Sequence, residues 1–514
     1  MVNMKNKIFI IILFVSFFFV FISCKKDIDV NTDDNNINIE EQDDDNKEEE
    51  NKEIYYDVRF IAGNGGEISG TVNQTVLDGA SSFPVKAIPY DGYDFYGWSD
   101  GSKELVYVID AVDHDIEVTA LFKKAIYEYP EIFINTDNNA EITSKDTYIN
   151  CNIYINDNKN PEYCLDFTSA RIKGRGNSTW DKPKKPYRIK FDEKIDLFGN
   201  GKNKDWTLIA NYIDLSMIRN YLAYTIGNSL DHLPYTTSCQ FVELYLNGKY
   251  PGLYLLCEQV EVGKNRVEID DKLGGDVSFL VELDNKYDDD DVLGIDYFYV
   301  NNQPYSIKAP KTDENGFNKD DCDKIKNYLE SCLKIVKEKS YKEITEVIDV
   351  NTFADGYIIN ELFGNVDVNW TSWYLCKDKN GLLMNGPIWD FDISCGNMDY
   401  NDQAKASNKL FANTNTWYKY LLRHNEFKIL VREKLIKYYP MFKEIIAREI
   451  DSIMKYKDYF LKNFERWDII GKKEWPHPDD IVKITSWEGH VEYVEKWLDA
   501  KLEYMISVYC REFD

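Results

Sequence analysis

Basic residues are outnumbered by acidic residues in this sequence, and the lack of net positive charge limits what the protein binds. Lys and Arg together number 61 against 89 Asp and Glu residues, which leaves a formal net charge of -28. Proteins that hold nucleic acids cluster Lys and Arg against the phosphate backbone. We therefore expect no nucleic acid partner and no broad electrostatic adhesion to anionic lipid.

Several motifs of metal sites and hydrolases are missing as well. The five histidines are dispersed, and the sequence contains no CxxC pair, no HExxH motif and no Ser-His-Asp order. We assign the histidines no catalytic role. Two interpretations stay open for Cys151 and Cys164: they bridge a pair of strands, or they remain free thiols that pack as small apolar side chains.

The apolar run near the N-terminus is too short to cross a membrane as a helix, which needs about 20 apolar residues. It extends from Ile8 to Ile22 and follows Lys5 and Lys7. Positive charge before a short apolar run is typical of a signal peptide. The run ends in Phe21-Ile22-Ser23-Cys24, which resembles a lipobox, whose Cys carries diacylglycerol.

This resemblance implies a lipoprotein signal peptide at residues 1–23 and lipidation of Cys24. We expect an extracytoplasmic protein held by lipid at the cell membrane or outer membrane. The alternatives, an uncleaved anchor or a plain secretory signal, also export the chain. Residues 24–53 are acidic, include Asp43-Asp-Asp45 and Glu48-Glu-Glu50, and contain almost no aromatic residue. We expect a disordered tether there, because like charges repel and nothing can be buried.

Residues 54–124 carry the pattern of a small all-β module. Alternating runs include Tyr56–Ile61, Phe83–Ile88 and Ile116–Phe122, with a turn at Gly63-Asn-Gly-Gly66. The segment Gly92-Tyr-Asp-Phe-Tyr-Gly-Trp98 completes a pattern that resembles an InlB-type B-repeat, a β-grasp-like module of surface proteins. We expect Phe95 and Trp98 in its core, and we interpret the module as a spacer or an adhesion unit.

Residues 130–514 predict an α+β domain, with strands to about residue 310 and helices afterwards. Asn247-Gly248 between two alternating runs predicts a hairpin. Apolar spacing predicts a helix from Leu215 to Leu230 with Asp214 as its N-cap. Further helices are predicted at 319–337, 352–363, 416–437, 440–465 and 487–511. A short hairpin is expected at Trp373–Met384.

Three groups of residues in this domain are suited to chemistry. Arg175 lies in a Gly-flanked turn, and Lys184 and Lys185 follow it; exposed N–H groups and basic side chains of this kind neutralise phosphate. Asp367 follows a predicted helix, and Asp390-Phe-Asp392 follows the next hairpin. Kinases use such a pair of carboxylates, one to deprotonate the attacking hydroxyl and one to bind magnesium.

The separated motifs of this region together resemble the CotH family, named for spore-coat protein kinases. They are Arg175-Gly-Asn-Ser178, Lys184-Lys-Pro-Tyr187, Asp214-x4-Arg219-Asn220, Leu246-Asn-Gly-x-Tyr-x-Gly252-x-Tyr254-x3-Glu258 and Trp389-Asp-Phe-Asp392. The resemblance implies a two-lobed atypical protein-kinase-like fold that binds ATP and Mg²⁺ and phosphorylates Ser or Thr of a protein acceptor at the cell surface.

Carried over to this sequence, the resemblance implies that Asp367 is the catalytic Asp and Asp390 the metal-binding Asp. Arg175, Lys184, Lys185 and Glu258 are then assigned to the nucleotide, and Asp392 to the metal.

One position departs from the kinase pattern. Kinases place an Asn metal ligand five residues after the catalytic Asp, and here that residue is Ser372. Ser is a weaker ligand, which keeps a pseudokinase or an adhesion lipoprotein open as an alternative. Simple structural roles also stay open: a helix end for Asp367, a loop cap for Asp390 and Asp392, and solvated strand-edge charge for Lys184 and Lys185.

Overall fold

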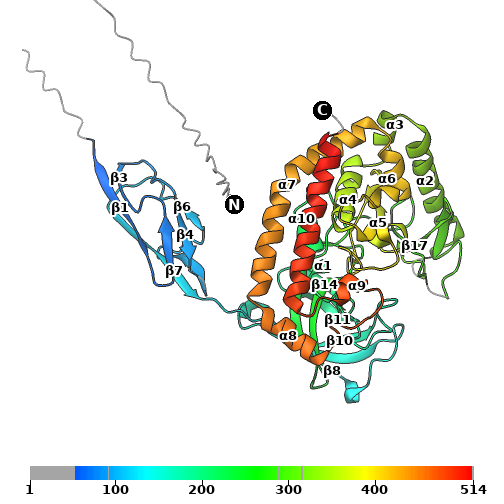
Figure 1. Cartoon of the computed structure of the whole chain (residues 1–514), viewed down its shortest axis with the longest axis horizontal. Coiled ribbons are helices and arrows are strands. Elements are labelled where there is room, and N and C mark those ends of the chain that lie inside the picture. Colours follow the sequence, from blue (N-terminus) through cyan, green and yellow to red (C-terminus); the bar gives the residue numbers. More distant parts are fainter. Residues whose placement is uncertain (1–52, 91, 288–289, 314–315, 512–514) are drawn as a thin grey trace, which may run out of the picture. The chain divides into compact units, whose positions relative to one another are not determined.

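The computed structural model describes residues 53–90, 92–287, 290–313 and 316–511. The predicted signal peptide, Cys24 and the tether up to residue 52 lie outside the described residues. The rest divides into two compact units, with the boundary after Lys124 (Figure 1). Within the described residues, none of the helices combines the length and the hydropathy that crossing a membrane requires.

The first unit is all-β over its described residues. One sheet has the order β3-β1-β7-β5 and a second has the order β2-β4-β6. The strands are β1 (Tyr55–Ala62), β2 (Gly66–Ser69), β3 (Asn73–Leu77), β4 (Val85–Pro89), β5 (Tyr93–Trp98), β6 (Val106–Tyr107) and β7 (Ile116–Lys124). Side chains alternate along them between buried and exposed, because successive strand residues face opposite sides of a sheet.

Trp98 is the centre of the small core between these sheets. It is 2% exposed, its ring packs against Phe60, Phe95 and Tyr107, and its Nε1 donates to the Glu104 carbonyl at 2.8 Å. The predicted core position of Trp98 is confirmed, and Phe95 packs beside it, partly buried.

The second unit begins with a closed barrel of seven strands, in the order β10-β11-β12-β14-β13-β8-β9. The strands are β8 (Glu131–Thr136), β9 (Ile149–Asn156), β10 (Leu165–Gly174), β11 (Tyr187–Asp196), β12 (Lys202–Ile209), β13 (Cys239–Leu246) and β14 (Lys249–Glu258). The predicted hairpin joins β13 to β14. Asn247 (φ 49°) and Gly248 (φ 73°) both adopt positive φ, as a two-residue hairpin turn requires.

A second sheet follows the barrel, in the order β16-β17-β15-β18-β19. Its strands are β15 (Phe279–Leu283), β16 (Tyr297–Val300), β17 (Gln303–Ala309), β18 (Trp373–Lys377) and β19 (Met384–Asn385). The short pair β18–β19 is the hairpin predicted between the two acidic motifs.

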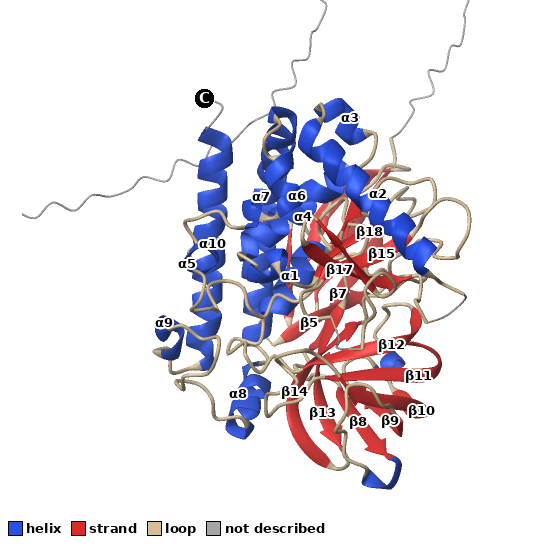
Figure 2. Ribbon diagram, turned by 90° about the vertical axis from the view of Figure 1, so that its right-hand side faces the viewer, coloured by secondary structure: helices blue, strands red, loops and turns tan. Residues whose placement is uncertain are grey.

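Most of the helices follow residue 318 in the chain (Figure 2). The helices are α1 (Arg219–Gly227), α2 (Lys319–Glu338), α3 (Tyr341–Thr345), α4 (Val350–Phe363), α5 (Asp402–Lys405), α6 (Thr416–Leu421), α7 (Asn425–Met454), α8 (Lys457–Arg466), α9 (Asp479–Val482) and α10 (Trp487–Arg511). The long helices α7 and α10 pack side by side. The α+β class predicted from the sequence is confirmed.

The helices predicted at 416–437 and 440–465 have wrong boundaries, because the structure divides these residues into α6, α7 and α8, with breaks after Leu421 and Met454. The break expected before Pro440 does not occur, because α7 continues through it. Buried Tyr438 and Phe442 continue the apolar face of α7 on both sides of Pro440, while the proline lies on the exposed face. The carbonyl that loses its N–H partner belongs to Ile436, which is also exposed.

The cysteines of the described residues are free thiols. Cys151 lies opposite Ala170 in the register of β9 and β10, and not opposite Cys164. The structure therefore agrees with the free-thiol interpretation of Cys151 and Cys164.

Replacing Trp98 by Ala tests the core of the first unit. We expect the substitution to lower the free energy of opening of this unit by about 3–5 kcal/mol, because it leaves a large cavity. Tyr96→Ala on the same strand is the control, since Tyr96 is 54% exposed. Amide hydrogen exchange of β1 and β7 in the full chain measures both effects; equal protection in the two variants would contradict the assignment.

Candidate active site

A cavity of about 750 Å³ lies between the barrel and the five-stranded sheet. Barrel residues such as Arg188 on β11 and Ile209 on β12 line one side, and Glu282 on β15 and Lys308 on β17 line the other. This volume is in the range of small-molecule sites in proteins. Its polar lining gathers residues that are far apart in the sequence.

Asp367 enters this cavity from the turn that follows α4. Gly364 ends the helix in the left-handed conformation (φ 55°), and a Cβ there would lie 2.8 Å from the Ala404 carbonyl oxygen, so the position requires glycine. The Asn365 side chain then accepts a hydrogen bond from the Asp367 N–H at 3.1 Å and starts a short 3-10 helix, Val366–Asn369. This turn aims the Asp367 carboxylate at the cavity.

Asp390 and Asp392 line the same cavity from the loop after β19. Asp390 adopts a positive φ of 62°, and so does Ser372 at 58°. Such backbone is uncommon for residues other than glycine and is concentrated at functional sites. The Ser372 hydroxyl lies 3.5 Å from Asp390 Oδ2. The predicted residues Asp367, Ser372, Asp390 and Asp392 are therefore brought together.

These carboxylates repel one another. Burial, followed by the charge of Asp390, raises the pKa of Asp367 to about 8. Burial raises the pKa of Asp390, and the charge of Arg175 opposes the shift. Burial and the charges of Asp390 and Asp367 also raise the pKa of Asp392. A cation between these groups would relieve the repulsion and favour their ionised forms.

Arg175 lies where the sequence placed it. It lines the cavity with Gly176, Asn177, Ser178 and Thr179, all in the loop between β10 and β11. Its guanidinium lies 5.6 Å from the centre of the Trp389 ring. Gly176 adopts φ 87°, and a Cβ there would lie 2.3 Å from the Thr179 hydroxyl, so this tight turn favours glycine.

Lys184 and Lys185 lie outside the cavity lining, contrary to their assignment to phosphate. Lys184 is 1% exposed; its ammonium donates to the Leu253 carbonyl and, at 2.8 Å, to Asn463 Oδ1. Burial lowers the pKa of Lys184 well below its ordinary value. Lys185 donates to the Trp180 carbonyl and lies over the Trp180 ring. Both lysines hold the barrel and its loop together.

Glu258 is also outside the lining and has a structural role. It is 2% exposed, pairs with Arg266, and accepts hydrogen bonds from the Tyr235 hydroxyl at 2.6 Å and the Ser238 N–H at 2.8 Å. These partners enclose the Glu258 carboxylate, and Glu258 does not line the cavity. The nucleotide role expected of Glu258 is not supported by this geometry.

The sequence interpretation missed a cluster around Lys308. The Lys308 ammonium lies 2.9 Å from Glu282 and 3.4 Å from Asp284. Burial lowers the pKa of Lys308, but the charges of Glu282 and Asp284 outweigh it and leave the pKa raised. Glu282 also accepts a hydrogen bond from the Ser372 N–H at 3.0 Å. The sequence did offer one signal for this cluster: Glu282 is a charged residue inside the otherwise apolar strand Phe279–Leu283.

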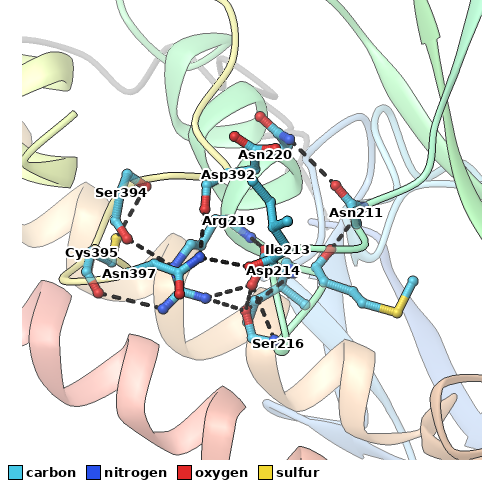
Figure 3. A network of polar contacts seen from close by, with 12 residues as sticks. Asn211, Ile213, Asp214, Ser216, Arg219, Asn220, Asp392, Ser394, Cys395 and Asn397 are labelled. Atoms are coloured by element: carbon cyan, nitrogen blue, oxygen red, sulfur yellow. Dashed lines mark hydrogen bonds and ion pairs between the residues drawn. The ribbon is translucent and has the colours of Figure 1, made fainter. Parts of the chain in front are cut away.

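A buried polar network fixes the loop that carries Asp390 and Asp392 (Figure 3). Arg219 pairs with Asp214, and its Nε donates to the Ser394 carbonyl at 2.9 Å. The Asn397 amide donates to the carbonyls of Ile213 and Asp392, at 2.8 and 2.9 Å. Through these bonds the segment after β12 holds the acidic loop in one position.

The start of α1 belongs to the same network. Asn220 accepts a hydrogen bond from the Phe391 N–H at 2.7 Å, and the Tyr224 hydroxyl accepts one from the Asp390 N–H at 3.3 Å. The helix begins at Arg219, later than predicted, because the Asp214 carboxylate accepts from Ser216 N and Arg219 N and closes a turn before it. The predicted N-cap role of Asp214 is therefore wrong: Ile218 is the N-cap residue, and Asp214 accepts the Arg219 N–H from outside the helix.

The donor set suits a magnesium ion. Asp390 and Asp392 supply carboxylate oxygens and Ser372 a hydroxyl oxygen, and Mg²⁺ prefers oxygen ligands at one or two carboxylates, with substrate phosphates and water completing its shell. In the described part of the chain, no three His, Cys, Asp or Glu side chains are already arranged around one metal position.

Comparison with known families agrees with the order of the two units. Residues 172–505 match the family model described as CotH kinase protein, and residues 56–126 match the one described as divergent InlB B-repeat domain. No curated protein matches the chain.

Removing the Arg219 side chain tests the network. Arg219→Met leaves Asp214 buried without its cation, and we expect the free energy of unfolding to fall by about 3–5 kcal/mol. Lys496→Met is the control, because Lys496 pairs with Glu492 on the exposed surface of α10 and such pairs contribute little. Urea unfolding measures both variants. Equal stabilities would show that the ion pair does not fix this region.

Proposed function

Because the chain belongs to the CotH kinase protein family, we propose that its cavity transfers phosphate from Mg-ATP to Ser or Thr of a protein acceptor. The observation that supports this most is the convergence of Asp367 and Asp390 on one cavity that Arg175 and Lys308 also line. Carboxylates suit a metal and an attacking hydroxyl, and the basic groups suit phosphate. The same cavity therefore suits a metal-bound triphosphate and the hydroxyl that attacks it.

In this proposal Asp367 is the catalytic base. Its raised pKa makes it a better proton acceptor once ionised, and it would take the proton of the acceptor hydroxyl as that oxygen attacks phosphorus. Lys286 lines the cavity, and its positive charge favours the ionised form of Asp367. The hydrogen bond from the Asp367 N–H to the Asn365 side chain fixes the direction of the Asp367 carboxylate.

Asp390, Asp392 and Ser372 would hold the metal, and the metal when bound neutralises charge on the phosphates. Arg175 would bind phosphate oxygens from the loop between β10 and β11, which lines the cavity. Lys308 is held by Glu282 and Asp284, and its ammonium is in place before the nucleotide arrives. Such pre-positioned charges lower the cost of reorganisation during transfer.

The architecture proposed for this activity has two lobes. The barrel of β8 to β14 would form one, and the five-stranded sheet with its helices the other, with the nucleotide between them. The InlB-like module would act as a spacer or an adhesion unit outside this catalytic domain.

Ser372 favours a second candidate, a domain that binds nucleotide without transferring phosphate. Ser372 is a weaker metal ligand than Asn, and its hydroxyl lies 3.5 Å from Asp390. In this candidate the second metal is lost and the cavity serves as a binding site. Nucleotide binding without transfer to any acceptor would support it.

Phosphate transfer tests the kinase directly. With ATP labelled at the γ-phosphate, Mg²⁺ and dephosphorylated casein or the chain itself as acceptor, we expect labelled protein. Asp367→Asn should lower the rate at least about 100-fold, since removal of a catalytic base has this scale of effect. Asp402→Asn, an exposed residue at the start of α5, is the matched control. Undiminished transfer by Asp367→Asn would refute the assignment.

The location is proposed from residues 1–24. We expect lipid on Cys24 to hold the protein at the extracytoplasmic face of a membrane, close to a surface or secreted acceptor. When the chain is expressed in bacteria fed labelled fatty acid, the protein should carry label and sediment with membranes. Cys24→Ala should remove the label; label retained in that variant would exclude this anchor.

A further inference from the structure

Two cysteines face each other across the β13–β14 hairpin. Cys239 opens β13 and Cys257 lies next to the end of β14, and the strand register places them directly opposite. From this geometry we propose that Cys239 and Cys257 are a modification site, where they form a reversible cross-strand disulfide. The proposal is independent of the kinase activity proposed above.

The hydrogen bonds around this pair show which kind of strand pair it is. The Glu258 N–H donates to the Ser238 carbonyl at 3.4 Å, so the hydrogen bonds belong to the neighbouring residues. Cys239 and Cys257 therefore occupy a non-hydrogen-bonded pair, in which Cα atoms are about 4.5 Å apart. Disulfides span Cα separations of about 4.4–6.8 Å, so the backbone already lies within reach of the bond.

No other pair of cysteines in the described strands has this relation. Cys151 lies opposite Thr136 and Ala170, and Cys376 lies opposite Leu280 and Met384. The structure thus offers one pair that closes without moving a strand.

The surroundings give the two thiols different roles. Cys239 is partly exposed, so a reagent can reach it, whereas Cys257 is 1% exposed. Burial, followed by a hydrogen bond to Cys239, raises the pKa of Cys257. We therefore expect Cys239 to react first and Cys257 to act as the resolving thiol.

The oxidant belongs to the class of disulfides, R–S–S–R. The Cys239 thiolate attacks one sulfur, the R–S–S–R bond breaks, and RS⁻ leaves; a mixed disulfide remains on Cys239. The Cys257 thiolate then attacks the Cys239 sulfur, and the second RS⁻ leaves. Two protein thiols are oxidised to one disulfide, R–S–S–R is reduced to two RS⁻, and the two protons of the protein thiols pass through solvent to these thiolates.

The bond would act on one wall of the cavity. Cys257 is followed by Glu258, which anchors Arg266, and then by Gln259 and Val260, which line the cavity. A disulfide between β13 and the end of β14 would restrict the movement of the segment that contains Gln259 and Val260. Cα atoms in non-hydrogen-bonded pairs are generally about 4.5 Å apart, at the short end of the disulfide range, so we expect strain and ready reduction, as in a regulatory bond rather than a permanent one.

Peptide mapping of the full chain tests the proposal. The reduced protein is treated with glutathione disulfide, the remaining thiols are alkylated, and the digest is analysed by mass spectrometry without reduction. We expect a linked pair of peptides containing Cys239 and Cys257, lighter by two hydrogen atoms than their sum, and its loss after dithiothreitol. Cys151→Ser should give the same linked pair.

A variant gives the second readout. Cys257→Ser should trap a mixed disulfide of glutathione on Cys239, because the resolving thiol is gone. Three results would overturn the proposal: a stable glutathione adduct on Cys239 in the wild type, linkage of Cys239 to another cysteine, or two free thiols at 239 and 257 when exposed Cys164 has reacted. If the variant does not fold, the wild-type map alone decides.

Discussion

The buried pair of Asp214 and Arg219 is the interaction on which the proposed active site depends. Both side chains are almost fully enclosed, and a charge without its partner would be costly there. Arg219 also donates to the carbonyl of Ser394, and Asp214 accepts the first helical N–H of α1. One ion pair therefore links the segment after β12, the start of α1 and the loop that carries Asp390 and Asp392.

This arrangement explains how acidic side chains are held near one another in spite of their repulsion. The Asp390 and Phe391 N–H groups are bound by Tyr224 and Asn220 of α1, so the loop cannot turn its carboxylates away. Asp390 keeps a positive φ as part of that restraint. The fold thus holds an anionic wall that a cation would stabilise, in a cavity that Arg175 and Lys308 also line.

Local patterns predicted the elements best where a single rule decided them. Asn247-Gly248 predicted its hairpin, and the alternation around Trp98 predicted the small β core. The boundary at Pro440 was wrong because tertiary packing of the α7 face outweighed the missing hydrogen bond. The start of α1 was wrong because Asp214 closes a turn, which apolar spacing does not reveal.

The site was predictable only in part. Asp367, Ser372, Asp390, Asp392 and Arg175 were identified from motif order, and the cavity gathers all of them. Lys184 and Glu258 belong to the same motifs but are buried among protein partners, since a motif records both structural and functional residues. Lys308 was missed because its partner Glu282 lies on another strand, and only the sheet register brings them together.

Calorimetric titration with ATP tests the central claim most directly, that Asp390 and its neighbours hold a metal-bound triphosphate in this cavity. The account predicts that wild type binds ATP in the presence of Mg²⁺, and that binding is greatly weakened when Mg²⁺ is removed or Asp390 is replaced by Asn. Binding of equal strength under all three conditions, or no binding by the wild type, would contradict it.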